Sequence, residues 1–189
     1  YKGMFLAEQV TDFYPDLLDE RFVSRFALYH QRYSTNTFPT WKLAQPFRVL
    51  AHNGEINTLR GNNNWMLCHE DRMESELFGD DVDHLKPVIE SGASDSAALD
   101  SVCELMLQGG RDLPMVKTMM VPEAVLPSAP QPLRDLYGYC NAVMEPWDGP
   151  AALAMVSGDW AMASVDRNGL RPMRVAVTND GLLVAGSET

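Results

Sequence analysis

The residue pair Asn53-Gly54 has the types that a site stabilising an oxyanion would need, and it follows the apolar run from Phe47 to Leu50. An Asn side chain donates N–H bonds without carrying a charge. A following Gly lets its backbone N–H approach a reacting carbonyl, because no Cβ is in the way. The pair could therefore supply two oxyanion donors. Asn-Gly is also the commonest two-residue turn of a β-hairpin, so a structural turn is the alternative.

Four further motifs accompany this pair along the chain, at residues 30–41, 91–96, 145–151 and 166–172. An Arg at position 32, the Asn-Gly pair and an Asp at position 95, in this order, resemble the glutamine-binding parts of the class II (N-terminal nucleophile) glutamine amidotransferases. Within that superfamily, the long string from residue 30 to residue 66 and the two later motifs are similar to the glutaminase domain of glutamate synthases. The resemblance covers essentially the whole chain.

The resemblance gives each candidate a role in binding glutamine. Arg32 offers a planar fork that matches a carboxylate with two hydrogen bonds, so we expect it to bind the α-carboxylate, with Thr35 as a second candidate for the same pocket. Asp95 would pair with the α-ammonium, while Asn53 and Gly54 would hold the amide oxygen as it becomes negative. The alternatives are an ordinary ion pair for Arg32 and a helix N-cap for Asp95, and a capping carboxylate can still face a ligand.

Other polar residues near these motifs are weaker candidates. His30 and His52 could act as general bases, but the pattern favours strand residues that hold loops by hydrogen bonds. For the three carboxylates near turns we expect solvated or structural roles; these are Glu55, Asp148 and Asp166. We expect no metal site.

The composition sets limits on the function. With 189 residues, 46% hydrophobic and 22% charged, the chain fits one domain of ordinary globular composition. A formal net charge of -11 opposes binding to nucleic acid or anionic lipid, and no basic stripe is visible. No apolar run approaches the roughly 18 residues that a spanning helix requires, and the first residues do not build a signal peptide. We therefore expect a soluble protein without nucleic-acid or membrane partners.

The three cysteines, Cys68, Cys103 and Cys140, are widely separated and lack a C-x-x-C pairing, which favours buried structural thiols in a reducing compartment. The resemblance places the family's nucleophile, a cysteine, at the mature N-terminus, where its own α-amino group serves as the base. The chain begins with Tyr1. We therefore expect residues 1–189 to be one segment of a glutaminase domain that lacks the catalytic cysteine and is inactive alone.

Several elements must position these residues. Residues 22–33 are rich in aromatic and branched side chains at period two, which predicts a strand that delivers Arg32 to its end. Residues 45–52 predict a second strand that finishes at the Asn-Gly pair, followed by a helix over 58–73. Another helix should start at Ser94 or Asp95 and stop at Gly109-Gly110.

The last third of the chain predicts a helix over residues 133–144, after a proline-rich loop at 122–132. Four strand segments follow with turn residues between them, which is typical of an antiparallel meander; they are 151–156, 160–165, 173–178 and 182–185. Strands and helices in this order argue for the α+β class. The resemblance sharpens this to the four-layer αββα sandwich of antiparallel sheets found in N-terminal nucleophile hydrolases, here incomplete.

The function that the resemblance implies is the glutaminase reaction of a glutamate synthase. L-Glutamine is hydrolysed to glutamate and ammonia, and the ammonia is channelled to a synthase domain that converts 2-oxoglutarate with reduced FMN and an iron–sulfur cluster. Neither cofactor is expected in this segment. The expected partners are L-glutamine, the other domains of the polypeptide and a small reductase subunit, in the cytoplasm or, for a plant-type protein, the plastid. Another class II amidotransferase and a non-catalytic glutamine-binding module are the alternatives.

Overall fold

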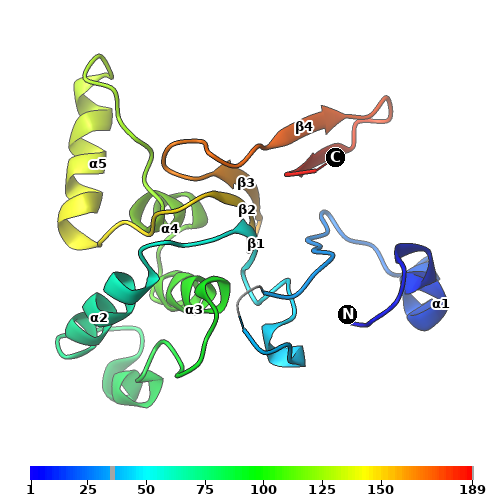
Figure 1. The fold of residues 1–189 in the computed structure, drawn as a ribbon, viewed down its shortest axis with the longest axis horizontal. Coiled ribbons are helices and arrows are strands. Elements are labelled where there is room, and N and C mark those ends of the chain that lie inside the picture. The colour runs from blue at the N-terminus through cyan, green and yellow to red at the C-terminus, as the bar shows by residue number, and fades with distance from the viewer. Residues whose placement is uncertain (35–36, 189) are drawn as a thin grey trace.

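The centre of the molecule is a three-stranded antiparallel sheet with helices on one face (Figure 1). The structure is a computed structural model that describes residues 1–34 and 37–188. The strands are β1 (Leu50–Gly54), β2 (Ala151–Ser157) and β3 (Trp160–Val165), in the order β1-β2-β3. β1 is therefore an edge strand, although it comes first in the sequence. One of its sides has no neighbouring strand among the described residues.

The helices that cover this sheet are α2 (Leu59–Glu70), α3 (Asp95–Gln108), α4 (Leu113–Met120) and α5 (Gln131–Val143). α3 contacts β1 and α4 contacts β2. The side chains between sheet and helices are fully or almost fully buried, and they include Leu50, Val102, Leu113, Val116, Met120, Trp147 and Leu153. Each such side chain contributes about 1.5–3 kcal/mol by leaving water, so this interface holds the sheet in place.

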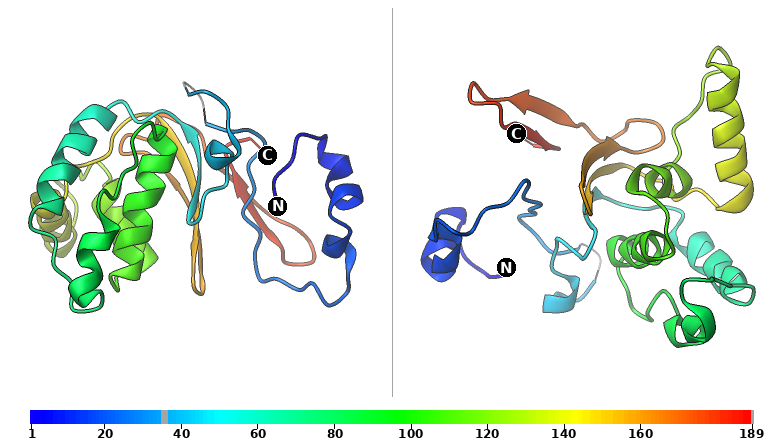
Figure 2. Two further views of the ribbon diagram at one scale, coloured as in Figure 1. Left: turned by 90° about the horizontal axis from the view of Figure 1, so that it is seen from below. Right: turned by 180° about the vertical axis from the view of Figure 1, so that it is seen from behind.

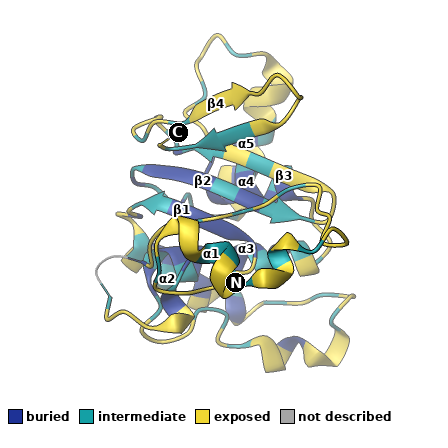
Figure 3. Cartoon of the chain, turned by 90° about the vertical axis from the view of Figure 1, so that its right-hand side faces the viewer, coloured by how far each residue is buried: buried dark blue, intermediate teal, exposed yellow. Residues whose placement is uncertain are grey.

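The opposite face of the sheet lies toward a second, two-stranded sheet formed by β4 (Arg174–Val177) and β5 (Leu183–Gly186). The left view of Figure 2 shows the helices on one side of β1–β3, and β4–β5 with the N-terminal segment on the other. Figure 3 shows that β2 is buried whereas β4 is exposed. The class is α+β with antiparallel sheets, as predicted from the sequence.

The prediction of a strand over residues 22–33 is wrong. In this stretch Tyr33 makes one isolated bridge with Ala44, and no ladder forms. The apolar side chains that suggested the pattern, Phe26 and Leu28, are only half-buried. Their neighbours Phe22, Val23 and Tyr29 are exposed. The residues before this stretch form the short helix α1 (Val10–Phe13) between 3-10 turns at Ala7–Gln9 and Pro15–Leu18. Without a paired neighbour, an alternating pattern does not specify a strand.

The predicted strand over residues 45–52 starts later, at Leu50. The buried carboxylate of Asp100 on α3 accepts the backbone N–H groups of Arg48 (3.2 Å), Val49 (2.9 Å) and Leu50 (3.0 Å). These donors are therefore held by a side chain rather than by a strand ladder. Burial raises the pKa of Asp100, and the three N–H bonds oppose that rise.

The helix predictions are confirmed except for one omission. α2, α3 and α5 lie within two residues of their predicted starts, and α3 ends at Gly109 as expected. α4 was not predicted, although its local signals are visible: Asp112 caps it by accepting the N–H of Met115 (2.9 Å), and a proline stands in the first turn. Two further 3-10 turns, Trp41–Leu43 and Gly79–Leu85, complete the helical elements of the described chain.

The predicted meander is correct for β2–β3 and for β4–β5 but wrong between β3 and β4, which belong to different sheets. The cause is Asp166, directly after β3. Its buried carboxylate accepts four backbone N–H groups, and so redirects the chain out of the sheet; the donors are Ala151, Asn168, Leu170 and Arg171. Burial alone would raise the pKa of Asp166, but these bonds hold it below its ordinary value. The role is structural, as expected.

The cysteines follow the prediction in part. Cys103 and Cys140 are buried, and burial raises the pKa of both thiols. Cys68 is exposed on α2, so the expectation of a buried thiol is wrong there. In the described ranges no helix is both long and apolar enough to cross a bilayer.

Candidate active site

Asn53 and Gly54 lie at the point where β1 leaves the sheet. They pair with Ala152 and Ala151 of β2, so the alternative of a hairpin turn is wrong. Immediately beyond them, Glu55 N donates to the carbonyl of Pro150 (2.8 Å) and Asn57 N to that of Asp148 (2.8 Å). The motif at residues 145–151 thus lies opposite this corner and leads into β2.

Gly54 is required by the close approach of two backbones. Its φ is +154°, and a Cβ at this position would lie 1.8 Å from the carbonyl oxygen of Pro150. Gly149 has the matching geometry, with φ +148° and a Cβ position 2.0 Å from the carbonyl oxygen of Glu55. The corner can close only because both residues lack a side chain.

The backbone N–H of Gly54 points away from β2. The N–H of Glu55 is directed toward β2, whereas the N–H of His52 donates to the side-chain oxygen of Gln45 (2.7 Å) on the other side. Backbone groups alternate in direction along a strand, so Gly54 shares the direction of His52. This N–H therefore faces the open edge of the sheet, where a ligand oxygen could accept it.

The side chain of Asn53 is half-buried and lies on the sheet face that is turned toward β5. Its amide nitrogen donates to the hydroxyl of Ser187, directly after β5, at 2.8 Å. An amide nitrogen carries two hydrogens, so one donor is left for a ligand. Ser187 lies 134 positions away, and no local sequence signal pointed to it.

Asp95 lies beside the same corner. One carboxylate oxygen accepts the N–H of Ile56 (2.9 Å) and the other that of Ser96 (2.7 Å), and the side chain is 13% exposed. The cap of α3 is Ser94, which accepts the N–H of Ala97 at 3.1 Å, so the N-cap alternative for Asp95 is wrong.

The segment that carries Arg32 lies against the start of α3, because the hydroxyl of Ser94 donates to that of Ser34 (2.9 Å). Arg32 is exposed, and its guanidinium has no hydrogen bond or ion pair within the described part of the chain. The ordinary ion pair considered for it is therefore not formed here. Thr35 lies outside the described residues. The structure thus brings Asn53, Gly54 and Asp95 together. Ser34, two residues after Arg32, lies next to them through its contact with Ser94.

The two candidate histidines have different environments. His52 is buried on β1, as expected for a strand residue, with Nδ1 2.8 Å from the hydroxyl of Ser96. His30 lies outside any strand, which corrects that part of the prediction, and its Nδ1 accepts the N–H of Arg32 (3.0 Å). Burial lowers the pKa of both rings below 6.5.

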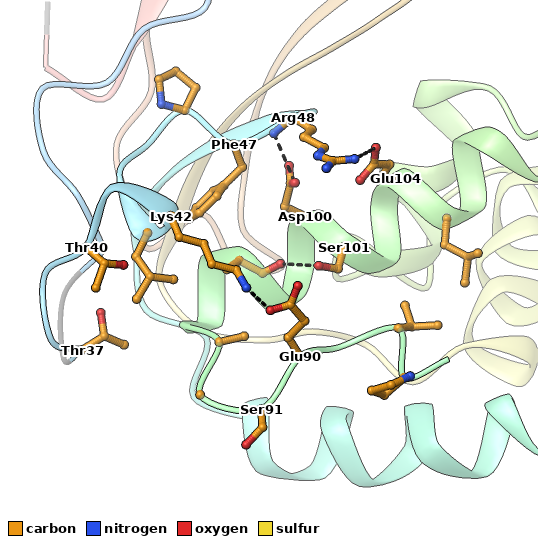
Figure 4. Close-up of a pocket in the computed structure, with 18 of the residues that line it drawn as sticks. Thr37, Thr40, Lys42, Phe47, Arg48, Glu90, Ser91, Asp100, Ser101 and Glu104 are labelled. Atoms are coloured by element: carbon orange, nitrogen blue, oxygen red, sulfur yellow. Dashed lines mark hydrogen bonds and ion pairs between the residues drawn. The ribbon is translucent and has the colours of Figure 1, made fainter. Parts of the chain in front are cut away.

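A cavity lies away from this corner, between the loop that precedes β1, residues 78–93 and α3 (Figure 4). Its volume is about 930 Å³, and of the predicted site residues that the structure describes none lines it. Four charged groups at its wall form ion pairs with one another, Lys42 with Glu90 and Arg48 with Glu104. We therefore keep the corner as the candidate site, because it holds donors and a carboxylate of the required types.

The pH dependence of stability should reflect His52. Burial is the main cause of its lowered pKa, His30 and Arg171 act in the same direction, and Asp95 opposes them. The unfolded chain therefore takes up a proton near pH 6.5 that the folded chain resists, and stability should fall as the pH drops through 6.5 toward the lower folded pKa.

Thermal unfolding between pH 8 and pH 5 would measure this dependence. A His52→Asn variant should lose the part of the slope that belongs to His52 and keep the rest. Identical slopes in the two proteins would contradict the assignment.

Comparison with known proteins is consistent with this geometry. The sequence matches the family described as "Glutamine amidotransferases class-II" over residues 1–189. The chain belongs to this family.

Within this family, the chain is similar in sequence to glutamate synthases. The chain is 65% identical to the glutamate synthase [NADPH] large chain of Azospirillum brasilense, 51% to the glutamate synthase [NADH] of Saccharomyces cerevisiae and 47% to the glutamate synthase [NADPH] large chain of Bacillus subtilis. Each match covers 100% of this chain but only 13%, 9% and 12% of the respective relative. The relatives are therefore much longer than the sequence described here.

Proposed function

We propose that residues 1–189 are a glutamine-binding segment of the glutaminase domain of a glutamate synthase. In this proposal Asn53 and Gly54 donate to the amide oxygen, Arg32 and Thr35 bind the α-carboxylate, and Asp95 binds the α-ammonium of L-glutamine. The observation that carries it is the hydrogen bond from the N–H of Ile56 to Asp95, which joins the carboxylate to the Asn-Gly corner in a chain of this family.

The chemistry would be acyl transfer through a thioester. A cysteine thiolate attacks the carboxamide carbon, the oxygen becomes negative, the C–N bond breaks and ammonia leaves with a proton. Water then hydrolyses the thioester to glutamate and regenerates the thiol. The buried Cys103 and Cys140 have raised pKa values, which disfavours the nucleophilic thiolate. We assign the nucleophile to an N-terminal cysteine outside these residues.

The fold supports a finer proposal, the four-layer αββα sandwich. The helical layer on β1–β3 would be one outer layer, and β4–β5, which lies across the other face, would contribute to the second sheet. The exposed apolar side chains of Val175, Val177 and Leu183 would then be covered by the remaining layer. Single-domain status for residues 1–189, as part of that sandwich, belongs to the same proposal.

The complete enzyme would use the ammonia on 2-oxoglutarate in a synthase domain, with reduced FMN and an iron–sulfur cluster. In the described residues no group of three or more His, Cys, Asp or Glu is placed to hold a metal ion. Because these residues do not fit a cluster, both cofactors would bind other parts of the polypeptide. A small reductase subunit and a cytoplasmic or plastid location belong to this proposal; one relative is described as chloroplastic.

Arg32→Lys in the full-length polypeptide should raise the KM for glutamine about tenfold to hundredfold and leave kcat almost unchanged. A point charge replaces a two-pronged donor, and a charged hydrogen bond of about 1.5–3 kcal/mol is lost from binding. Steady-state glutamine hydrolysis, followed by ammonia release, measures both constants. Arg60→Lys on α2 is a matched control. Unchanged saturation would remove Arg32 from the pocket, and a wild-type protein that binds glutamine but releases no ammonia would indicate a binding module.

A further inference from the structure

His52 is a buried titratable group next to the proposed site that the acyl-transfer steps do not use. Its side chain points from β1 toward α3, on the side opposite to Asn53. It is only 2% exposed, and Nε2 has no hydrogen-bond partner in the described ranges of the chain. The favourable polar contact of the ring is therefore made by Nδ1.

The contact made by Nδ1 leads to Asp95 through one hydroxyl. Ser96, which is 3% exposed, donates its hydroxyl proton to a carboxylate oxygen of Asp95 at 3.2 Å. Since a hydroxyl has a single proton, its oxygen then accepts from the Nδ1–H of His52 at 2.8 Å. This assignment leaves the lone pair of a neutral ring on Nε2. Nδ1 of His52 makes no direct hydrogen bond to Asp95, because it is 3.9 Å from the other carboxylate oxygen.

The backbone of His52 is held as firmly as its ring. Its N–H donates to Gln45 (2.7 Å), and its carbonyl accepts from the same side-chain amide (2.9 Å). Gln45 is also buried. The backbone that carries the ring is therefore fixed. If the Ser96 side chain rotated away from Asp95, its hydroxyl oxygen would also lose the hydrogen bond from Nδ1–H of His52.

We propose that His52 and Ser96 are positioning residues that orient the carboxylate of Asp95 toward the α-ammonium of the substrate. Three donors then fix this carboxylate, the N–H groups of Ile56 and Ser96 and the Ser96 hydroxyl, which leaves one direction for a cation. His52 and Ser96 thereby raise the selectivity for an amide substrate that carries an α-ammonium group over one that lacks it. The inference rests on the proposed binding of glutamine at Asp95.

The test compares glutamine with glutaramate, the monoamide of glutaric acid, which has the carboxylate and amide but no ammonium group. In the full-length polypeptide, Ser96→Ala and His52→Gln should each lower kcat/KM for glutamine roughly fivefold to tenfold, mainly through KM, and leave glutaramate unchanged. The double variant should lose little more kcat/KM than either single variant, because both changes break the same chain of hydrogen bonds from His52 through Ser96 to Asp95. His52→Asn, whose amide nitrogen can take the place of Nδ1, should keep most of the selectivity for glutamine over glutaramate that His52→Gln loses.

The outcomes separate this inference from the proposed function. Equal losses for both substrates, or no loss for glutamine, would overturn the positioning role. Asp95→Asn provides the reference: it should abolish the preference for glutamine over glutaramate. If it does so while Ser96→Ala and His52→Gln do not, only the inference fails. If Asp95→Asn leaves the preference intact, the proposed ammonium site fails and the inference fails with it.

Discussion

Asn53→Ala in the full-length polypeptide should lower glutamine-dependent turnover by about 10²–10³-fold, which corresponds to about 3–4 kcal/mol in the transition state. The physical reason is the loss of a neutral donor that meets the amide oxygen only when that oxygen becomes negative. The KM for glutamine should change little. Glutamate synthesis supplied with ammonia should persist, because it bypasses the thioester. Parallel assays with glutamine and with ammonia measure the two activities.

A matched variant controls for the structural role of the same amide. Ser187→Ala removes the hydrogen bond that holds the amide of Asn53 at 2.8 Å but leaves its donors in place. It should therefore reproduce only a small part of the loss. If Ser187→Ala is as damaging as Asn53→Ala, or if both activities of Asn53→Ala fall together, the oxyanion role of Asn53 is wrong.

Gly54→Ala should destabilise the domain by about 3 kcal/mol or more and abolish glutamine hydrolysis. The added Cβ would stand 1.8 Å from the carbonyl oxygen of Pro150, and the φ of +154° is itself unfavourable for a side chain. Relief would require β1 and residue 150 to move apart, which breaks the bond from Glu55 N to Pro150. The midpoint of thermal or denaturant unfolding measures the effect.

The control for this substitution is another glycine. Gly61 lies in α2 with open space around its Cβ position, and Gly61→Ala should be neutral or stabilising by up to about 1 kcal/mol. Equal stability of the Gly54→Ala and wild-type proteins would show that the corner is open in solution. Such a result would contradict the close approach described here.

Helices and their ends were predictable because their signals are local. The period of apolar side chains, the Ser-Asp pair at the start of α3 and the Gly-Gly pair after its end each act on the residues next to them. The chemical types of the candidate site were visible for the same reason, since an Asn-Gly pair and an Asp at a helix start are short patterns. The resemblance then supplied their common substrate, and the family match agrees with it.

Strand pairing was predictable only where a short turn joined the strands. β2 and β3 met that condition, whereas β1 finds its partner about a hundred residues later and the stretch 22–33 finds none in the described chain. Two buried carboxylates made the difference at the sheet edges. Asp100 holds the N–H groups before β1 and Asp166 those after β3, and nothing in the local sequence distinguishes them from solvated acids.

The class of the fold, most helices and the residue types that suit glutamine chemistry follow from the sequence alone, because they depend on local periodicity, caps and side-chain chemistry. How those residues meet depends on the packing of the folded chain. It placed Asp95 on the N–H of Ile56, Ser187 on Asn53 and the hydroxyl of Ser96 between His52 and Asp95. Such contacts join distant segments, so they exist only once sheet and helices have packed.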